Sequence, residues 1–226
     1  MVRLTVLFTD RADAGRRLAR QLAALRGENV VVLGLPRGGV PVAFEVAEEL
    51  GAPLDVIVVR KLGLPVQPEL AMGAVGEGGI LIINHEVVRR SWVSAEDVAT
   101  AEQRERRELE RQAGRFRAGR ARVSVGGRTA VLVDDGIATG STARAACEVA
   151  RGQGAARVIM TAPVGAPGSA TALRDSGSCD EVHLVRAPSS FSSVGEWYAD
   201  FTPVSDAEVA SLLERAAQAR PEHASR

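Results

Sequence analysis

The stretch VLVDDGIATGSTARAA, residues 131–146, decides the fold of this 226-residue chain. It opens with an apolar run typical of a buried β-strand, and the run ends in two adjacent acids, Asp134 and Asp135. A turn of small and hydroxyl residues follows and leads into an amphipathic segment that we expect to be helical. A strand that passes through such a turn into a helix is the repeating unit of a parallel sheet covered by helices.

Outside this stretch, apolar runs rich in Val and Ile alternate with amphipathic segments, which predicts more units of the same kind. Strands are expected at residues 30–35, 54–60, 129–134, 157–163 and 181–186. Crossover helices are expected from Asp10 to Leu25, from Pro41 to Leu50 and from Ser141 to Gly152. The sequence therefore predicts an α/β fold with a five-stranded parallel sheet flanked by helices.

One long insertion, at about residues 62–128, interrupts this alternation. Its first part is dense in Gly and Pro and then becomes β-like, which predicts a mobile loop or a hairpin. Its second part, residues 94–117, is highly charged and carries Glu102 and Arg106 at i,i+4 spacing, so we expect a largely solvated helix. The polar tail from Gln218 to Arg226 is expected to fray.

The composition limits the class of protein. With 46% hydrophobic residues the chain can bury one sizeable core, so we expect a single domain over residues 1–226. Lys plus Arg equals Asp plus Glu at 28 each, so the overall charge favours neither nucleic acid nor an anionic membrane as a partner. No signal peptide and no apolar stretch of bilayer length is found, and there are only 2 cysteines. We expect a cytoplasmic protein.

The turn after Asp135 contains the residues of a phosphate site. Its small and hydroxyl residues allow backbone N–H groups to face inward at the positive end of the following helix; they are Gly136, Thr139, Gly140, Ser141 and Thr142. Asp134 and Asp135 stand beside that phosphate, where acids would repel it unless they served hydroxyl groups or a metal. A ribose phosphate satisfies both demands.

Two further elements follow predicted strands. The segment GLPRGGVPVA, residues 34–43, offers the donor fork of Arg37, and Gly38 and Gly39 can adopt conformations closed to other residues. Arg60 and Lys61 follow the apolar run LDVIVV. Each element alone also occurs as a plain surface turn or a strand end. Together with the first motif they fall at the carboxyl edge of the sheet, where open parallel sheets bind ligands.

The segment 131–146 resembles the motif with which type I phosphoribosyltransferases bind phosphoribosyl pyrophosphate (PRPP). The resemblance implies that Asp134 and Asp135 bind the ribose 2- and 3-hydroxyls, and that Ala138 to Thr142 wrap the 5-phosphate. It implies that the loop at Arg37, Gly38 and Gly39 binds pyrophosphate. Arg60 and Lys61 would contact the PRPP phosphates.

The resemblance also implies an activity, a cofactor and an assembly. The chain would use PRPP with Mg²⁺ to transfer ribose 5-phosphate to a nitrogenous base in nucleotide salvage, as a homodimer and without nucleic acid or membrane. Mg²⁺ would arrive with the diphosphate and meet Asp134 and Asp135 only through PRPP or water. Arg37 and Lys61 would join the two acids as the catalytic residues. The stretch 64–79 would be a loop that closes over the reacting centre.

The acceptor base is left open by the sequence. Hypoxanthine- and guanine-type members carry an acid where this chain has Ala138, whereas adenine-type members carry the same Ala, so a purine is slightly favoured. A hood would be built from the N-terminal segment and from about residues 188–226. The run SSFSSVGEWYADF, residues 189–201, would either stack on a flat base or form a hydrophobic lid.

Two other classes of function stay open. A non-catalytic PRPP-binding regulatory protein is the main alternative, and the arginine-rich segment 104–122 would then be a candidate surface for a partner or nucleic acid. A hydrolase of phosphorylated ribosides would need an acid or His that activates water. The three histidines are scattered and lack the spacing of a metal site or a nucleophilic relay.

Overall fold

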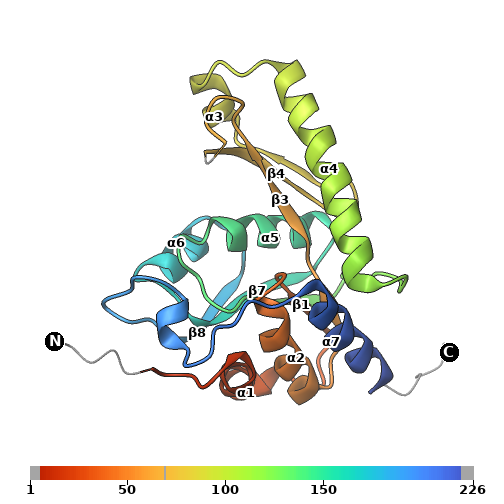
Figure 1. Cartoon of the computed structure of the whole chain (residues 1–226), viewed down its shortest axis with the longest axis vertical. Coiled ribbons are helices and arrows are strands. Elements are labelled where there is room, and N and C mark those ends of the chain that lie inside the picture. The colour runs from red at the N-terminus through yellow and green to blue at the C-terminus, as the bar shows by residue number, and fades with distance from the viewer. Residues whose placement is uncertain (1–5, 69, 220–226) are drawn as a thin grey trace.

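The computed structural model describes residues 6–68 and 70–219, so the predicted fraying of residues 220–226 lies outside the described part. Its main sheet has five parallel strands in the order β2-β1-β6-β7-β8, which confirms the predicted architecture (Figure 1). The strands are β1 (Val30–Gly34), β2 (Leu54–Val56), β6 (Thr129–Val133), β7 (Arg157–Val164) and β8 (Glu181–Arg186).

Helices cover both faces of this sheet. The helices α1 (Arg11–Gln21), α2 (Gly39–Leu50) and α7 (Asp206–Gln218) lie on one face, and α5 (Ser141–Gly152) and α6 (Ser169–Asp175) lie on the other (Figure 1). Because successive strand residues point to opposite faces, Val131 and Val133 pack with the first layer while Ala130 and Leu132 pack with the second. Two hydrophobic cores therefore share one sheet.

The strand predicted at residues 54–60 is wrong in its second half. The strand β2 ends at Val56, and residues 59–63 form a new strand, β3 (Val59–Gly63), which pairs antiparallel with β4 (Ala71–Gly76) in a second sheet. Ile57 and Val58 are buried at the bend between the two sheets. Apolar residues therefore continue through the bend without interruption, and hydrophobicity alone could not reveal it.

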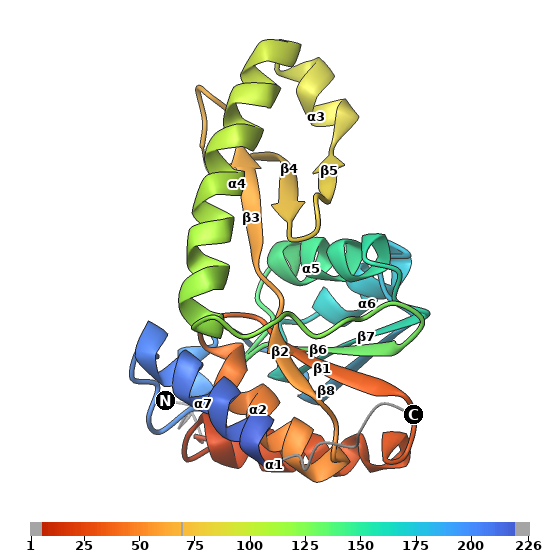
Figure 2. The ribbon, with the colours of Figure 1, turned by 90° about the vertical axis from the view of Figure 1, so that its right-hand side faces the viewer.

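A long arm, residues 59–117, rises from the sheet (Figures 1 and 2). It comprises β3, β4, β5 (Leu81–Ile83), the short helix α3 (His85–Arg90) and the helix α4 (Ala95–Arg117). The strands β3, β4 and β5 form an antiparallel sheet, so of the two alternatives for this segment, a mobile loop or a hairpin, the hairpin is the one observed. Residues 71–76 of the stretch 64–79, expected to be a closing loop, belong to β4. The predicted charged helix is confirmed as well, and α4 buries a single stripe that includes Ala101, Glu105 and Leu109.

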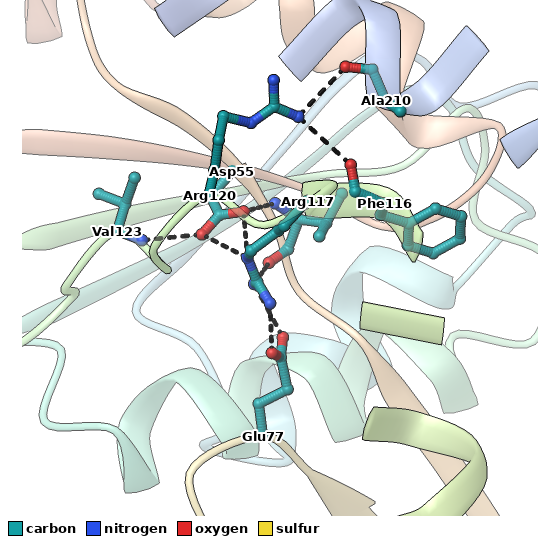
Figure 3. Close-up of polar contacts among 8 residues, drawn as sticks. Asp55, Glu77, Phe116, Arg117, Arg120, Val123 and Ala210 are labelled. Carbon is teal, nitrogen blue, oxygen red and sulfur yellow. Dashed lines mark hydrogen bonds and ion pairs between the residues drawn. The ribbon is translucent and has the colours of Figure 1, made fainter. Parts of the chain in front are cut away.

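The base of the arm is fixed to the sheet by buried charges (Figure 3). The guanidinium of Arg117, at the end of α4, donates to both carboxylate oxygens of Asp55 over 2.8 and 3.1 Å and to the carbonyl of Val56 over 3.1 Å. Glu77, which follows β4, accepts from the other side of the same guanidinium. Val123 N–H donates to Asp55 over 2.9 Å. A strand, a helix and the arm sheet thus share one ion-pair cluster.

None of the helices in the described part of the chain combines the length and the apolar character that a bilayer span needs.

Candidate functional site

The two acids of the first motif stand directly after β6, at the carboxyl edge of the main sheet. Asp135 N–H donates to Asp134 Oδ1 over 2.9 Å, and the Arg11 guanidinium donates to Asp135 Oδ2 over 2.9 Å. Burial, and then the neighbouring Asp135 charge, raise the pKa of Asp134 to about 8. Burial also raises the pKa of Asp135, and the hydrogen bond from Arg11 opposes this rise. The pair is costly to ionise until a ligand contributes donors.

The hydroxyl-rich turn opens α5 beside these acids. Gly140 has a φ of 75°, a left-handed conformation that glycine adopts without strain, and it precedes the first residue of the helix. Thr139 Oγ1 and Ser141 Oγ lie 3.2 Å apart, and both residues are exposed. At its other end the turn is tied to β7, where Ile137 N–H donates to the carbonyl of Val164 over 2.9 Å. The predicted phosphate turn is therefore a fixed loop with exposed hydroxyls at a helix N-terminus.

Lys61 reaches this turn but Arg60 does not. Lys61 Nζ donates to Ser141 Oγ over 2.7 Å. Arg60 precedes it in β3 and therefore points away, where its guanidinium pairs with Glu105 of α4 at 2.7 Å. The two cations were expected at the end of a main-sheet strand, and they lie instead inside the first strand of the arm. The arm thus brings Lys61 to the turn.

A cavity of about 410 Å³ lies where the arm faces the turn. Thr142 lines it from the start of α5, Arg60 and Lys61 line it from β3, and Arg104 and Glu105 line it from α4. Three of these five side chains are cationic at neutral pH, so the cavity favours a polyanion such as a diphosphate.

The loop after β1 packs closely against the acids, and its glycines are needed for space and not for a special backbone conformation. The Pro36–Arg37 peptide bond is cis, and Gly38 has a φ of −60°, which any residue can adopt. Glycine is required here for space, because a Cβ on Gly38 would lie 1.9 Å from Asp135 Oδ2 and one on Gly39 would lie 2.4 Å from the Val133 carbonyl. The expectation of a special glycine conformation at these two positions is wrong, because Gly38 is right-handed and neither glycine has a positive φ.

The guanidinium of Arg37 turns away from the acids. Its Nε lies 2.8 Å from Asp206 Oδ1 in the first turn of α7. About half of the side chain is exposed, at 53%. The loop therefore lies beside the candidate ribose site, as expected, while its cation is held at the rim by an acid from the far end of the chain.

The aromatic run near the C-terminus forms a small core of its own. We call residues 191–204 the hood segment. Tyr198 is buried and stacks between Phe8 and Phe201, with ring centroids 5.4 and 5.1 Å apart. Tyr198 Oη donates to the Asp135 carbonyl over 2.6 Å. Of the two alternatives for this run, the hydrophobic lid is the one that the burial of Tyr198 supports. The helix α7, expected as part of the hood, packs instead on α2 and α4.

Sequence reasoning missed two residues at this site, Arg11 and Glu105. Arg11 and Asp135 are 124 residues apart, and Arg60 and Glu105 are 45 residues apart. Neither pairing leaves a local pattern. The one available signal was the placement of Glu105 on the apolar stripe of α4, because an acid on such a stripe needs a buried partner. Glu77, whose role was left open, belongs to the Arg117 cluster, and Glu69 lies outside the described residues.

A family model described as phosphoribosyl transferase domain matches residues 8–192. The chain belongs to this family. Two curated relatives from Mycobacterium tuberculosis strains, named "Putative phosphoribosyl transferase MT0597" and "Putative phosphoribosyl transferase Rv0571c", are each 56% identical over 210 residues. The match covers 93% of this chain and 47% of each relative, so the chain spans about half the length of these relatives.

A solved structure shows the same fold. The crystal structure of TT1426 from Thermus thermophilus is 42% identical to this phosphoribosyl transferase chain and superposes with a TM-score of 0.83. The match covers 92% of this chain and 98% of TT1426. A similarity of this extent includes the arm as well as the main sheet, so the arm belongs to a shared architecture.

Proposed function

We propose that this phosphoribosyl transferase uses PRPP with Mg²⁺ to transfer ribose 5-phosphate to a nitrogenous base and releases pyrophosphate. One observation carries the proposal. Asp134 and Asp135 have too few donors around them to balance their buried negative charges, and they stand at a strand end beside a hydroxyl-rich turn. Lys61 donates a hydrogen bond to that turn. Acids beside an anion site are expected where the ligand is a sugar phosphate, because the acids bind the sugar hydroxyls while the turn binds the phosphate.

In this proposal the chain acts mainly by positioning and charge. Ala138 to Thr142 hold the 5-phosphate through N–H and hydroxyl donors, while Asp134 and Asp135 accept from the ribose hydroxyls. As the bond from the anomeric carbon to pyrophosphate breaks, negative charge grows on the leaving group. Lys61, Arg60 and Arg104 line the cavity that would receive it, while Arg37, in the loop after β1, is paired with Asp206. Fixed cations stabilise that charge without reorganisation.

The residues present fit a magnesium ion that is carried by the substrate. No group of three or more acids, histidines or cysteines in residues 6–68 and 70–219 could hold a metal by itself. Asp134 and Asp135 supply carboxylate oxygens of the kind Mg²⁺ prefers, and they would meet the ion through PRPP or water. Bound to the diphosphate, the ion would neutralise charge on the leaving group.

The acceptor that we propose is a purine-type base. Ala138, an exposed residue, stands where an acid would be needed to exchange a proton with the ring, so the nucleophilic nitrogen would attack without a dedicated protein base at that position. The packing of the hood segment leaves Tyr198 unable to stack on this base, because its ring is already covered by Phe8 and Phe201.

A regulatory PRPP-binding role is the alternative, and the arm gives it little support as a nucleic-acid surface. Several arginines of the segment 104–122 are already paired: Arg104 with Glu105, Arg106 with Glu102, Arg111 with Glu108, and Arg117 with Asp55 and Glu77. Phosphates would have to compete with these carboxylates.

The deciding experiment is thermal unfolding with PRPP and Mg²⁺, repeated with a panel of purine and pyrimidine bases, while pyrophosphate release is followed in the same wells. We expect stabilisation by PRPP and release that depends on one base. Stabilisation without release for any base would favour the regulatory alternative. Release without a base would indicate a hydrolase, and no stabilisation at all would contradict the PRPP site.

A further inference from the structure

Asp135 is held by a residue from the first turn of α1. Arg11 Nε donates to Asp135 Oδ2 over 2.9 Å, and Arg11 Nη1 donates to the Thr202 carbonyl of the hood segment over 2.9 Å. The guanidinium lies over the Phe201 ring, 4.0 Å from its centroid. The side chains of Arg11 and Asp135 are only 11% and 14% exposed. One planar cation thus joins the hood segment to an acid of the proposed ribose site.

The other contacts of Asp135 restrict it to one position. Any Cβ on Gly38 would collide with its carboxylate, so the loop after β1 closes one side. Tyr198 Oη fixes its carbonyl, and its own N–H is engaged by Asp134. Arg11 donates to Oδ2, and no other residue in the described part of the chain donates a hydrogen bond to Oδ1. The carboxylate therefore has one anchored oxygen and one left for a ligand.

We infer that Arg11 is a positioning residue that fixes the Asp135 carboxylate so that Oδ1 meets a ribose hydroxyl. Through Arg11, ribose binding also depends on the hood segment. The inference rests on the proposed function. Its physical basis is the fork of the guanidinium, because one nitrogen holds the acid while another holds the hood backbone. The Phe201 ring covers the cation and limits its rotamers.

A matched control is available on the same helix. Arg17 also stacks on an aromatic ring, Phe8, at 5.5 Å, and also pairs with an acid, Asp13, at 2.9 Å. Asp13 is not part of the proposed site. Arg17→Gln therefore removes the same kinds of contact as Arg11→Gln without touching Asp135.

The experiment is titration calorimetry of the wild type, Arg11→Gln, Arg11→Lys and Arg17→Gln with three ligands: PRPP with Mg²⁺, ribose 5-phosphate, and inorganic pyrophosphate. Only the first two carry ribose hydroxyls. For Arg11→Gln we expect about tenfold weaker binding or more for those two, and pyrophosphate affinity within about twofold of the wild type. Lys keeps the charge but lacks the fork, so Arg11→Lys should recover part of the loss. Arg17→Gln should match the wild type.

The outcomes separate this inference from the proposed function. A wild type that binds none of the ligands would overturn the proposed function and the inference with it. A wild type that binds PRPP, together with an Arg11→Gln variant of unchanged ribose 5-phosphate and PRPP affinity, would overturn the inference alone. So would an equal loss for all three ligands, which indicates general loosening. If Arg11→Gln does not fold, Arg11→Lys decides by the same selective loss for ribose-containing ligands.

Discussion

Two regions of this molecule hold acids on or directly after main-sheet strands, and they are built in opposite ways. Asp55, on β2, accepts from the Arg117 guanidinium, from Val123 N–H and from Val56 N–H. Asp134, after β6, accepts from the N–H of Asp135, which is itself an acid. The first acid is fully compensated and holds the arm on the sheet. The second retains unused capacity as an acceptor, which is what a site for hydroxyl groups or a metal requires.

Removing the cation of the Arg117 cluster should cause the largest loss of folding stability. Arg117→Ala leaves Asp55 and Glu77 buried without their guanidinium, and breaking a buried pair from one side costs about 3–5 kcal/mol. Urea unfolding should show a lower midpoint with the slope unchanged. A loss of stability below about 1 kcal/mol would mean that water replaces the guanidinium and that the cluster is not the anchor of the arm.

The acids Asp134 and Asp135 should contribute more to ligand binding than to folding stability. At 100 times its dissociation constant, PRPP with Mg²⁺ should stabilise the wild type by about 2.7 kcal/mol. The double variant Asp134→Asn, Asp135→Asn should lose this protection and still fold, since the amide side chains retain the shape of the acids. Thermal unfolding with and without PRPP measures the effect, and full protection of the double variant would contradict the assignment of the ribose site.

The same difference predicts a dependence on pH. Because the pKa of Asp134 is raised from 3.8 to about 8 in the folded state, the folded chain holds that proton more tightly than the unfolded chain. The stability it contributes is fully present below about pH 4 and is lost as the pH rises through about 8. Asp134→Asn without ligand should therefore be more stable than the wild type at pH 9, by about 1 kcal/mol or more, and should retain little of this advantage at pH 4. Unfolding of both proteins at the two pH values is the measurement.

An exposed ion pair provides the smallest expected effect. Arg90 pairs with Glu86 at i,i+4 spacing on α3, and their side chains are 76% and 58% exposed. Arg90→Ala should change the stability by no more than about 0.5 kcal/mol, and less in high salt. Paired with Arg117→Ala in the same urea series, it separates the effect of burial from the effect of losing an arginine. Similar losses in both variants would remove the distinction between the two kinds of pair.

The two regions also differ in how far the sequence reveals them. The acids at 134 and 135 could be placed beside a phosphate turn because strand, acids, turn and helix are contiguous, and backbone geometry then determines their arrangement. The Arg117 cluster could not be predicted, because Asp55 and Arg117 are 62 residues apart and each looks like an ordinary charged residue in its own segment. The break between β2 and β3 was hidden for a similar reason, since the apolar residues run through it.

The sequence by itself determined the five-stranded parallel sheet, its helices, the long helix of the insertion and the local phosphate turn, because each depends on short-range periodicity and on residues a few positions apart. Only the tertiary structure decided the course of the arm, the separation of Lys61 from Arg60, the pairing of Arg37 with Asp206 and the hold of Arg11 on Asp135. These depend on long-range packing, in which a charged side chain takes whichever partner the fold brings within reach, and no local pattern encodes that choice.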